Sequence, residues 1–241
     1  MAFPNATSIG SYAFRDCGKL SSVNIPNTTS IENYTFYNCF ALTTVNSPNA
    51  TSIGERAFYS CTELTSADFP NVTSIGGNAF DNCKALTSAN FPNTTSINGN
   101  TFNNCYKLAT AIFSKAESIG NMAFYNCHRL NKVIIGTDLT TVATLSSGST
   151  VFYCCYHITG VTHSNYNPTG AKDGYIYVPL ALVADYRSAT NWATYASQIM
   201  PYVATVEELA NIDGTTYDKA CVGTDYIEYT YNGTAWEVYE R

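Results

Sequence analysis

Cysteine and histidine side chains that could bind zinc gather in one region of the sequence. Thiolate and imidazole groups are the usual ligands of tetrahedral zinc sites. The repeat register described below turns the Cys127 and Cys155 positions inward and the His128 and His157 positions outward, so these groups cannot converge. We therefore expect no metal site and no other cofactor. The candidates are Cys127, His128, Cys154, Cys155, His157 and His163.

Nucleophilic catalysis would need a histidine beside a serine or cysteine, with a carboxylate to orient it. The three histidines lie between residues 128 and 163, and the acidic residues nearby, Asp138 and Asp173, lie in expected loops. No local signature of a hydrolase and no glycine-rich phosphate loop is found. The sequence predicts that the protein is not an enzyme.

The elements that hold these residues come from an internal repeat with a period of 22 residues. A fixed period of this size is typical of stacked repeat architectures. Four apolar columns recur in register: Cys17, Cys39, Cys61, Cys83, Cys105 and Cys127; Ile9, Ile31, Ile53, Ile75, Ile97 and Ile119; Phe14, Phe36, Phe58, Phe80, Phe102 and Phe124; Leu20, Leu42, Leu64, Leu86, Leu108 and Leu130.

One unit, residues 73–93, predicts the path of a single coil. Ala89 and Phe91 alternate as in a strand of three to five residues, and Pro92-Asn93 then forms a turn. Ile75, Phe80 and Cys83 supply the opposite inward wall. One unit cannot enclose its own apolar residues, so neighbouring coils must stack at about 4.8 Å.

The cysteine column raises a question about disulfide bonds, because stacked coils bring equivalent Cα atoms to about 5 Å. Parallel side chains point the same way, however, and rarely reach the dihedral angle that a disulfide needs. We expect buried, reduced, apolar thiols along this column.

The six copies of Thr-Ser-Ile-Gly-x-x-Ala-Phe-x-x-Cys-x-x-Leu-x-x-x-x-(Phe/Ile)-Pro span roughly residues 3–136. This pattern resembles the BspA-like, or Treponema-type, leucine-rich repeats, although 22 residues stand where 23 are common. The resemblance implies a β-rich solenoid with a curved right-handed superhelix and short parallel strands. It also implies a bacterial cell-surface protein that contacts host or neighbouring cells, and it brings no catalytic residues.

Three regions are predicted. Residues 1–165 form the solenoid, which ends in an irregular seventh unit that places Phe152, Cys155, Ile158 and Val161 at the Phe, Cys, Leu and Val positions. Its insertion, Thr137 to Thr150, is expected to be a surface loop. Residues 166–202 form a cap and residues 203–241 a small β tail module.

The cap predicts a last strand, Tyr175 to Val178 and Pro179, and a helix from Leu180 to Met200 that Pro201 ends. At the other end no cap is found, because Phe3-Pro4-Asn5 enters in mid-repeat. We expect an upstream segment or a partner subunit to cover Phe3, Ile9 and Phe14, or else these side chains stay exposed.

The tail predicts a hairpin around Asn232-Gly233, a strong two-residue turn signal. Pairing across that turn would oppose Tyr229 with Trp236 and Ile227 with Val238. An isolated hairpin is marginal in water, so we expect it to gain strands from Val203 to Val222 or to dock elsewhere.

Asparagines in the Pro-Asn-x-Thr turns match the glycosylation pattern, but their recurrence with the repeat favours side-chain bonds to turn backbone. The outward positions vary more than the inward ones. Exposed aromatic rings there could contact sugar rings or a protein, or only pad the surface. The candidate binding face consists of two neighbouring columns: Tyr37, Tyr59 and Tyr125, and Phe40, Tyr106 and His128.

Composition narrows the possible partners. The net charge is −6 and only 12 % of residues are charged, which argues against nucleic-acid binding. No stretch is apolar enough to cross a membrane, and the first residues, Met1 to Asn5, lack the features of a signal peptide.

These observations favour a surface or secreted adhesion protein that recognises a host or cell-surface protein or glycan. The alternatives are a virion-associated component, such as a phage tail or fibre, and a purely structural spacer. The expected location is extracellular or on the cell surface, with the virion as alternative.

Overall fold

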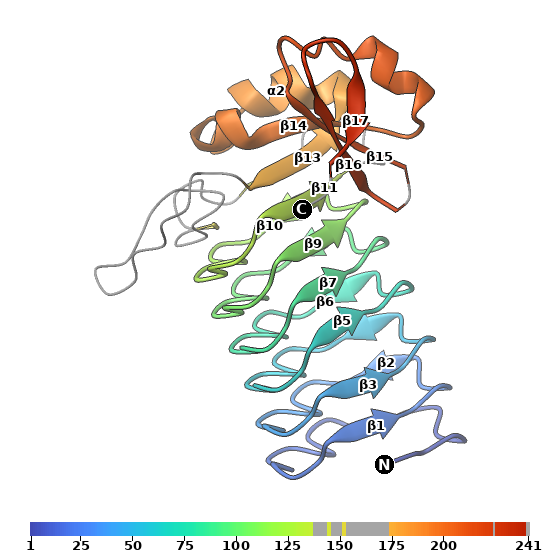
Figure 1. Ribbon diagram of the computed structural model, residues 1–241. Helices are drawn as coiled ribbons and strands as arrows, with labels where there is room; N and C mark the ends of the chain where they lie inside the picture. Colours follow the sequence, from blue (N-terminus) through green and yellow to red (C-terminus); the bar gives the residue numbers. More distant parts are fainter. Residues whose placement is uncertain (137–143, 146–150, 153–173, 224, 240–241) are drawn as a thin grey trace.

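The computed structural model describes residues 1–136, 144–145, 151–152, 174–223 and 225–239. It shows a β-solenoid in which short parallel strands of successive coils lie side by side (Figure 1). This confirms the predicted fold class. Strands of the first wall are β1 (Ser22–Asn24), β3 (Thr44–Asn46), β5 (Ser66–Asp68), β7 (Ser88–Asn90), β9 (Thr110–Phe113) and β11 (Lys132–Ile135).

A second set of two-residue strands contains the isoleucine column, and these strands were not predicted. Each of these strands has only two residues, which is too short to show the alternation of apolar and polar residues that predicts a strand. They are β2 (Ser30–Ile31), β4 (Ser52–Ile53), β6 (Ser74–Ile75), β8 (Ser96–Ile97), β10 (Ser118–Ile119) and β12 (Thr144–Leu145).

The strand register equals the sequence period. Ala67 pairs with Ala89, and Ile53 pairs with Ile75. The central strand residues therefore point inward and build a column along the stack, and in β1, β5 and β7 the residues on either side are more exposed.

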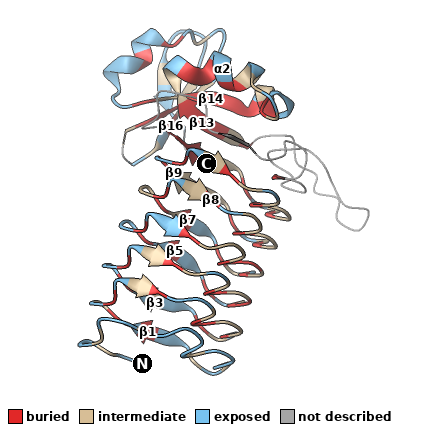
Figure 2. Cartoon of the chain, turned by 180° about the vertical axis from the view of Figure 1, so that it is seen from behind, coloured by how far each residue is buried: buried red, intermediate tan, exposed pale blue. Residues whose placement is uncertain are grey.

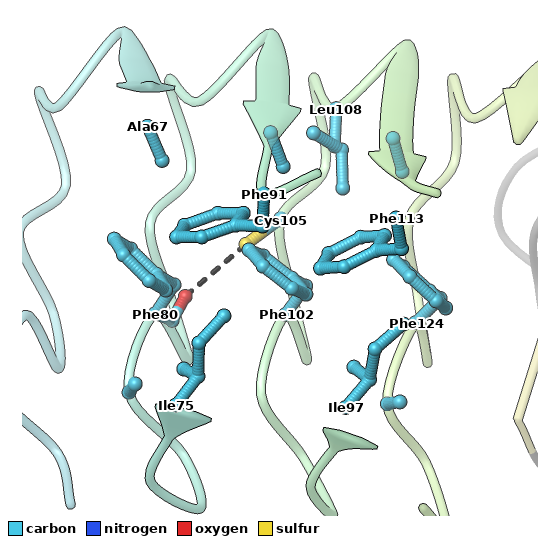
Figure 3. Close-up of a cluster of buried hydrophobic side chains, with 14 of the residues drawn as sticks. Ala67, Ile75, Phe80, Phe91, Ile97, Phe102, Cys105, Leu108, Phe113 and Phe124 are labelled. Atoms are coloured by element: carbon cyan, nitrogen blue, oxygen red, sulfur yellow. Dashed lines mark hydrogen bonds between the residues drawn. The ribbon is translucent and has the colours of Figure 1, made fainter. Parts of the chain in front are cut away.

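Two columns of phenylalanine rings fill the core (Figure 3). Phe80 stacks on Phe102 with ring centroids 5.3 Å apart, and Phe91 stacks on Phe113 at 5.6 Å. These side chains are fully buried, and burying each one contributes about 1.5–3 kcal/mol. Because each coil buries its rings against the next, stability comes from stacking between coils.

The cysteine column consists of free thiols, as predicted, and each buried thiol is also a hydrogen-bond donor. The Sγ–H of Cys105 donates to the carbonyl oxygen of Phe80 in the preceding coil at 3.1 Å (Figure 3). Burial raises the pKa of Cys39 to about 12 and that of Cys83 well above its ordinary value. Cys17 is exposed, so the expectation of burial is wrong there, because no described coil packs on its outer side.

The irregular seventh unit is placed only in part. Phe152 continues the phenylalanine column and stacks on Phe124 at 5.3 Å, as predicted. Val133 pairs with Ile176 of the later strand β13. The other predicted positions of this unit, Cys155, Ile158 and Val161, lie outside the described residues, as do Cys154, His157 and His163.

The C-terminal cap begins with the predicted strand, β13 (Tyr175–Pro179), but the single long helix is wrong. The helical turns η1 (Leu180–Leu182), α2 (Val183–Ser188) and η2 (Ala193–Gln198) replace it. Helix α2 stops because Ala189 has an extended backbone, with φ −65° and ψ 148°. Pro201 ends no helix, since it pairs with Val178 inside strand β14 (Ile199–Val203).

The cap still closes the stack as expected. Val183, Tyr186, Trp192 and Ile199 are buried in the same core cluster as the coils. Figure 2 shows buried residues along α2 and β14. Tyr195 packs edge-on against Phe152, with centroids 5.1 Å apart and an interplanar angle of 83°.

The tail extends the same sheet instead of standing apart. Strand β15 (Lys219–Val222) pairs with β14, after η3 (Glu207–Asn211), and β16 (Ile227–Tyr231) and β17 (Trp236–Val238) follow antiparallel. The predicted strands between Val203 and Val222 are thus confirmed.

The predicted hairpin register is wrong. Tyr231 pairs with Trp236, and Tyr229 pairs with Val238. The connection therefore spans residues 232–235, because the Asn232 side-chain oxygen accepts bonds from the Thr234 and Ala235 amides and organises a wider turn.

At the N-terminal end, Phe3, Ile9, Phe14 and Leu20 are only partly buried against the core. A concavity of about 670 Å³, lined in part by Met1, Phe14 and Leu20, opens there. That an upstream segment or a partner subunit covers these side chains stays a prediction. Among the described residues, no helix has the length and apolar character needed to cross a bilayer.

Candidate binding surface

The wall that carries the outward aromatic residues is fixed by its backbone. In the first coil, the N–H groups of Tyr12, Phe14 and Asp16 donate to carbonyl oxygens of the next coil at 2.7–3.1 Å. Tyr12 and Asp16 have left-handed φ values of 63° and 59°. The same two positions are left-handed in every described regular coil, so this costly backbone conformation belongs to the fold and not to one site.

Six residues on this wall form one connected cluster, which we name the tyrosine–arginine patch. Tyr12 stacks on Tyr34 with centroids 5.0 Å apart, and Tyr37 stacks on Tyr59 at 4.9 Å. Tyr34 and Tyr37 join the two pairs at 5.6 Å. Cation–π contacts add the two arginines. The patch consists of Tyr12, Arg15, Tyr34, Tyr37, Arg56 and Tyr59.

The arginines are held by the rings. The Arg15 guanidinium lies over Tyr37 and Tyr12, 5.2 and 5.7 Å from the ring centroids. Arg56 lies 5.8 Å from the Tyr34 centroid and donates to the Tyr34 hydroxyl at 2.7 Å, a bond that raises the pKa of Arg56. Both side chains are therefore ordered before any ligand arrives.

Acidic groups border the patch. Arg15 Nε donates to Asp16 at 3.2 Å, and Arg56 Nη1 lies 3.2 Å from Glu55. Asp81 follows Tyr59 in the same column and is buried, which raises its carboxyl pKa to about 6. Burial, and then the Asp81 charge, raise the pKa of Tyr59. The patch thus ends at a carboxylate that is costly to ionise.

The predicted binding residues fall into separate groups. Tyr37 and Tyr59 belong to the patch, whereas Tyr106 and His128 form another stacked pair at 5.0 Å. Tyr125 lies three coils beyond Tyr59, or about 14 Å along the stack. Phe40 is exposed, and its ring lies against Gly18 in the coil before. The structure therefore does not join all six candidates in one surface.

The sequence interpretation overlooked Tyr12, Arg15, Tyr34 and Arg56. Tyr12, Tyr34 and Arg56 stand 22 residues apart, and Arg15 heads the column that contains Tyr37. This spacing was visible, but the adjacency of the two columns depends on the left-handed turns of the wall.

The asparagine column of the Pro-Asn turns forms hydrogen bonds between successive coils. Asn71 Nδ2 donates to the Pro48 carbonyl at 2.9 Å, and Asn93 does the same to Pro70 at 2.7 Å. The predicted backbone bonding of this asparagine column is confirmed, although each bond reaches the preceding coil. No group of three or more potential metal ligands occurs among the residues that the structure describes.

Comparison with known families now adds to this geometry. The BspA type leucine rich repeat region matches residues 1–109 and 95–170, in six copies. The chain belongs to the BspA-type leucine-rich repeat family. BspA-type solenoids of this kind are typically binding scaffolds without catalytic activity. Comparison with curated proteins gives no significant match.

Several solved structures of bacterial proteins match this chain. The T. pallidum leucine-rich repeat protein TpLRR is 23 % identical, with a TM-score of 0.58 over 64 % of this chain and 75 % of that chain. A leucine-rich cell surface protein of Faecalibacterium prausnitzii is 21 % identical, with a TM-score of 0.38 over 87 % and 67 % of the two chains. The pneumococcal vaccine antigen PcpA is 15 % identical, with a TM-score of 0.41 over 82 % and 39 %.

Proposed function

We propose that this BspA-type protein is a non-enzymatic adhesion protein, displayed at the cell surface or secreted, that holds a protein or glycan of another cell. The observation that carries this proposal is the tyrosine–arginine patch. Its rings form a connected, partly exposed surface on a wall fixed by backbone bonds between coils. Tyrosine and arginine are, with tryptophan, the side chains enriched at binding hot spots.

The rigid wall supports binding in a second way. Tyrosine rings offer a large contact area at a low cost in conformational entropy, and stacking already restricts them. Tyr12 is 50 % exposed and Phe40 is 48 % exposed, so apolar area remains for a partner. Binding of a ligand would therefore cost little conformational entropy at this face.

The test is a binding screen of the labelled chain against a glycan microarray and a panel of immobilised extracellular matrix proteins and mucins. The variant Tyr37→Ala/Phe40→Ala/Tyr59→Ala should lose at least about tenfold in affinity for whatever the chain binds. Its matched control is Tyr106→Ala/His128→Ala, which removes the other stacked pair.

Selective loss by the first variant, with unchanged circular dichroism, supports the proposal. Equal binding by the wild type and the first variant excludes this surface. Turnover of any bound molecule would contradict a purely binding role.

A further inference from the structure

The stacking geometry of the patch bears on the kind of ligand it can take. Tyr12 and Tyr34 are nearly parallel, with an interplanar angle of 10°, and Tyr37 and Tyr59 differ by 8°. A sugar ring stacks on an open aromatic face, but here the facing sides of each pair cover one another. Arg15 covers part of Tyr12 and Tyr37 in addition. The surface thus offers ring edges and hydroxyl groups more than open faces.

The two guanidinium groups supply the specific chemistry. Arg15 uses Nε for Asp16, and Arg56 uses Nη1 for Tyr34 and Glu55. Their remaining nitrogens, Nη1 and Nη2 of Arg15 and Nε and Nη2 of Arg56, have no partner in the described part of the chain. The side chains remain 47 % and 39 % exposed. A guanidinium edge with two free N–H groups fits a carboxylate.

Within the two columns that hold Arg15 and Arg56, cationic side chains occur in the first and third coils alone. The positions that hold Arg15 and Arg56 in the first and third coils are taken by Asp81, Asn78, Asn100 and Asn103 in the next two. An anionic group that contacts these two columns would therefore find its guanidinium donors at the patch.

We infer that the tyrosine–arginine patch recognises a protein segment with carboxylate side chains, and not a neutral glycan. This inference rests on the proposed function and names its partner class. In the complex, a carboxylate accepts from the outer edge of Arg15 or Arg56, while the ring edges and hydroxyl groups contact the adjoining peptide. Asp16 and Glu55 remain bonded to one edge of each guanidinium group, so the site binds only a limited number of additional carboxylates.

The experiment is a selection from a random 12-residue peptide display library on the wild-type chain, with counter-selection on Tyr37→Ala/Tyr59→Ala. Enriched peptides should contain Asp or Glu. Their affinity, measured by fluorescence anisotropy, should fall at least about tenfold in Arg15→Gln/Arg56→Gln. The matched control is Lys84→Gln/Lys107→Gln, which removes two exposed cations from later coils and should bind as the wild type does.

Three outcomes would overturn the inference: no peptide enriched above the counter-selected variant, enriched peptides without carboxylates, or affinity unaffected by the double arginine change. A neutral glycan that binds in the microarray and depends on Tyr37 and Tyr59 would also overturn it, while leaving the proposed function intact. Melting curves of each variant, equal to those of the wild type, separate loss of binding from loss of fold.

Discussion

Ser47 occupies a position that holds a buried apolar residue in the neighbouring coils. Ile25 and Phe69 fill the equivalent sites before and after it, and all three side chains are buried. The Ser47 hydroxyl has no hydrogen-bond partner among the described residues. A buried polar group without a partner costs about 1–3 kcal/mol.

Replacing this residue should therefore stabilise the protein. Ser47→Val removes the orphan hydroxyl and adds apolar contacts, so we expect the free energy of unfolding to rise by about 1–2 kcal/mol. Urea unfolding followed by circular dichroism measures it. Ser47→Ala, which only removes the hydroxyl, should gain less. A loss of stability in the valine variant would show that the site has no room.

Asp81 makes stability depend on pH. Its carboxyl pKa rises from 3.8 to about 6, first because of burial, and against the opposing effects of Asn104 and Arg56. Between about pH 4 and 6 the native state therefore binds more protons than the unfolded state, so ionisation of this group lowers stability as pH rises.

Asp81→Asn should remove this dependence, and asparagine already stands at the equivalent position 103. The variant should match the wild type near pH 4 and exceed its unfolding free energy above pH 6 by at most about 3 kcal/mol. Urea titrations at pH 4, 5, 6 and 7.5 provide the comparison. A constant difference across that range would show that Asp81 titrates normally.

Among the elements, the cap shares a buried core with the last coils. Tyr195 is buried and packs edge-on against Phe152, which in turn stacks on Phe124. In a stack of repeats each coil depends chiefly on its neighbours, so a weakened cap should loosen the adjacent coils first.

Tyr195→Ala should accelerate backbone hydrogen exchange around Phe124 and Val133, because removing a large buried aromatic side chain costs about 3–5 kcal/mol. Exchange around Phe36 and Phe58 should change little. Mass spectrometry of peptide fragments resolves the two regions, and the exposed Thr194→Ala is the control. Equal acceleration along the whole stack would instead indicate one cooperative unit.

The sequence predicted the structure best where one pattern repeats and least well where the chain departs from that pattern. The columns of Ile75, Phe80 and Cys83 predicted the inward wall, because identical spacing must give identical burial in a stack. The local sequence did not indicate that helix α2 would end at Ala189 or that Asn232 would organise a wider turn. These outcomes depend on packing of the cap and on side-chain bonds within the tail.

The binding surface was predictable only in part for a similar reason. Tyr37 and Tyr59 share a column, and the period alone placed them together. Tyr34 and Arg56 lie in another column, whose position beside the first depends on left-handed residues that the sequence did not reveal.

For the whole molecule, the central claim is that the solenoid presents the tyrosine–arginine patch to a partner. Hydroxyl-radical footprinting of the complex with the tightest ligand from the screen tests it most directly, since aromatic side chains are modified readily when exposed. We predict protection of Tyr12, Tyr34, Tyr37 and Tyr59, with Tyr106 unchanged. Protection of Tyr106 or of the exposed Ile227 and Val238 in the tail, with the patch unprotected, would contradict the claim.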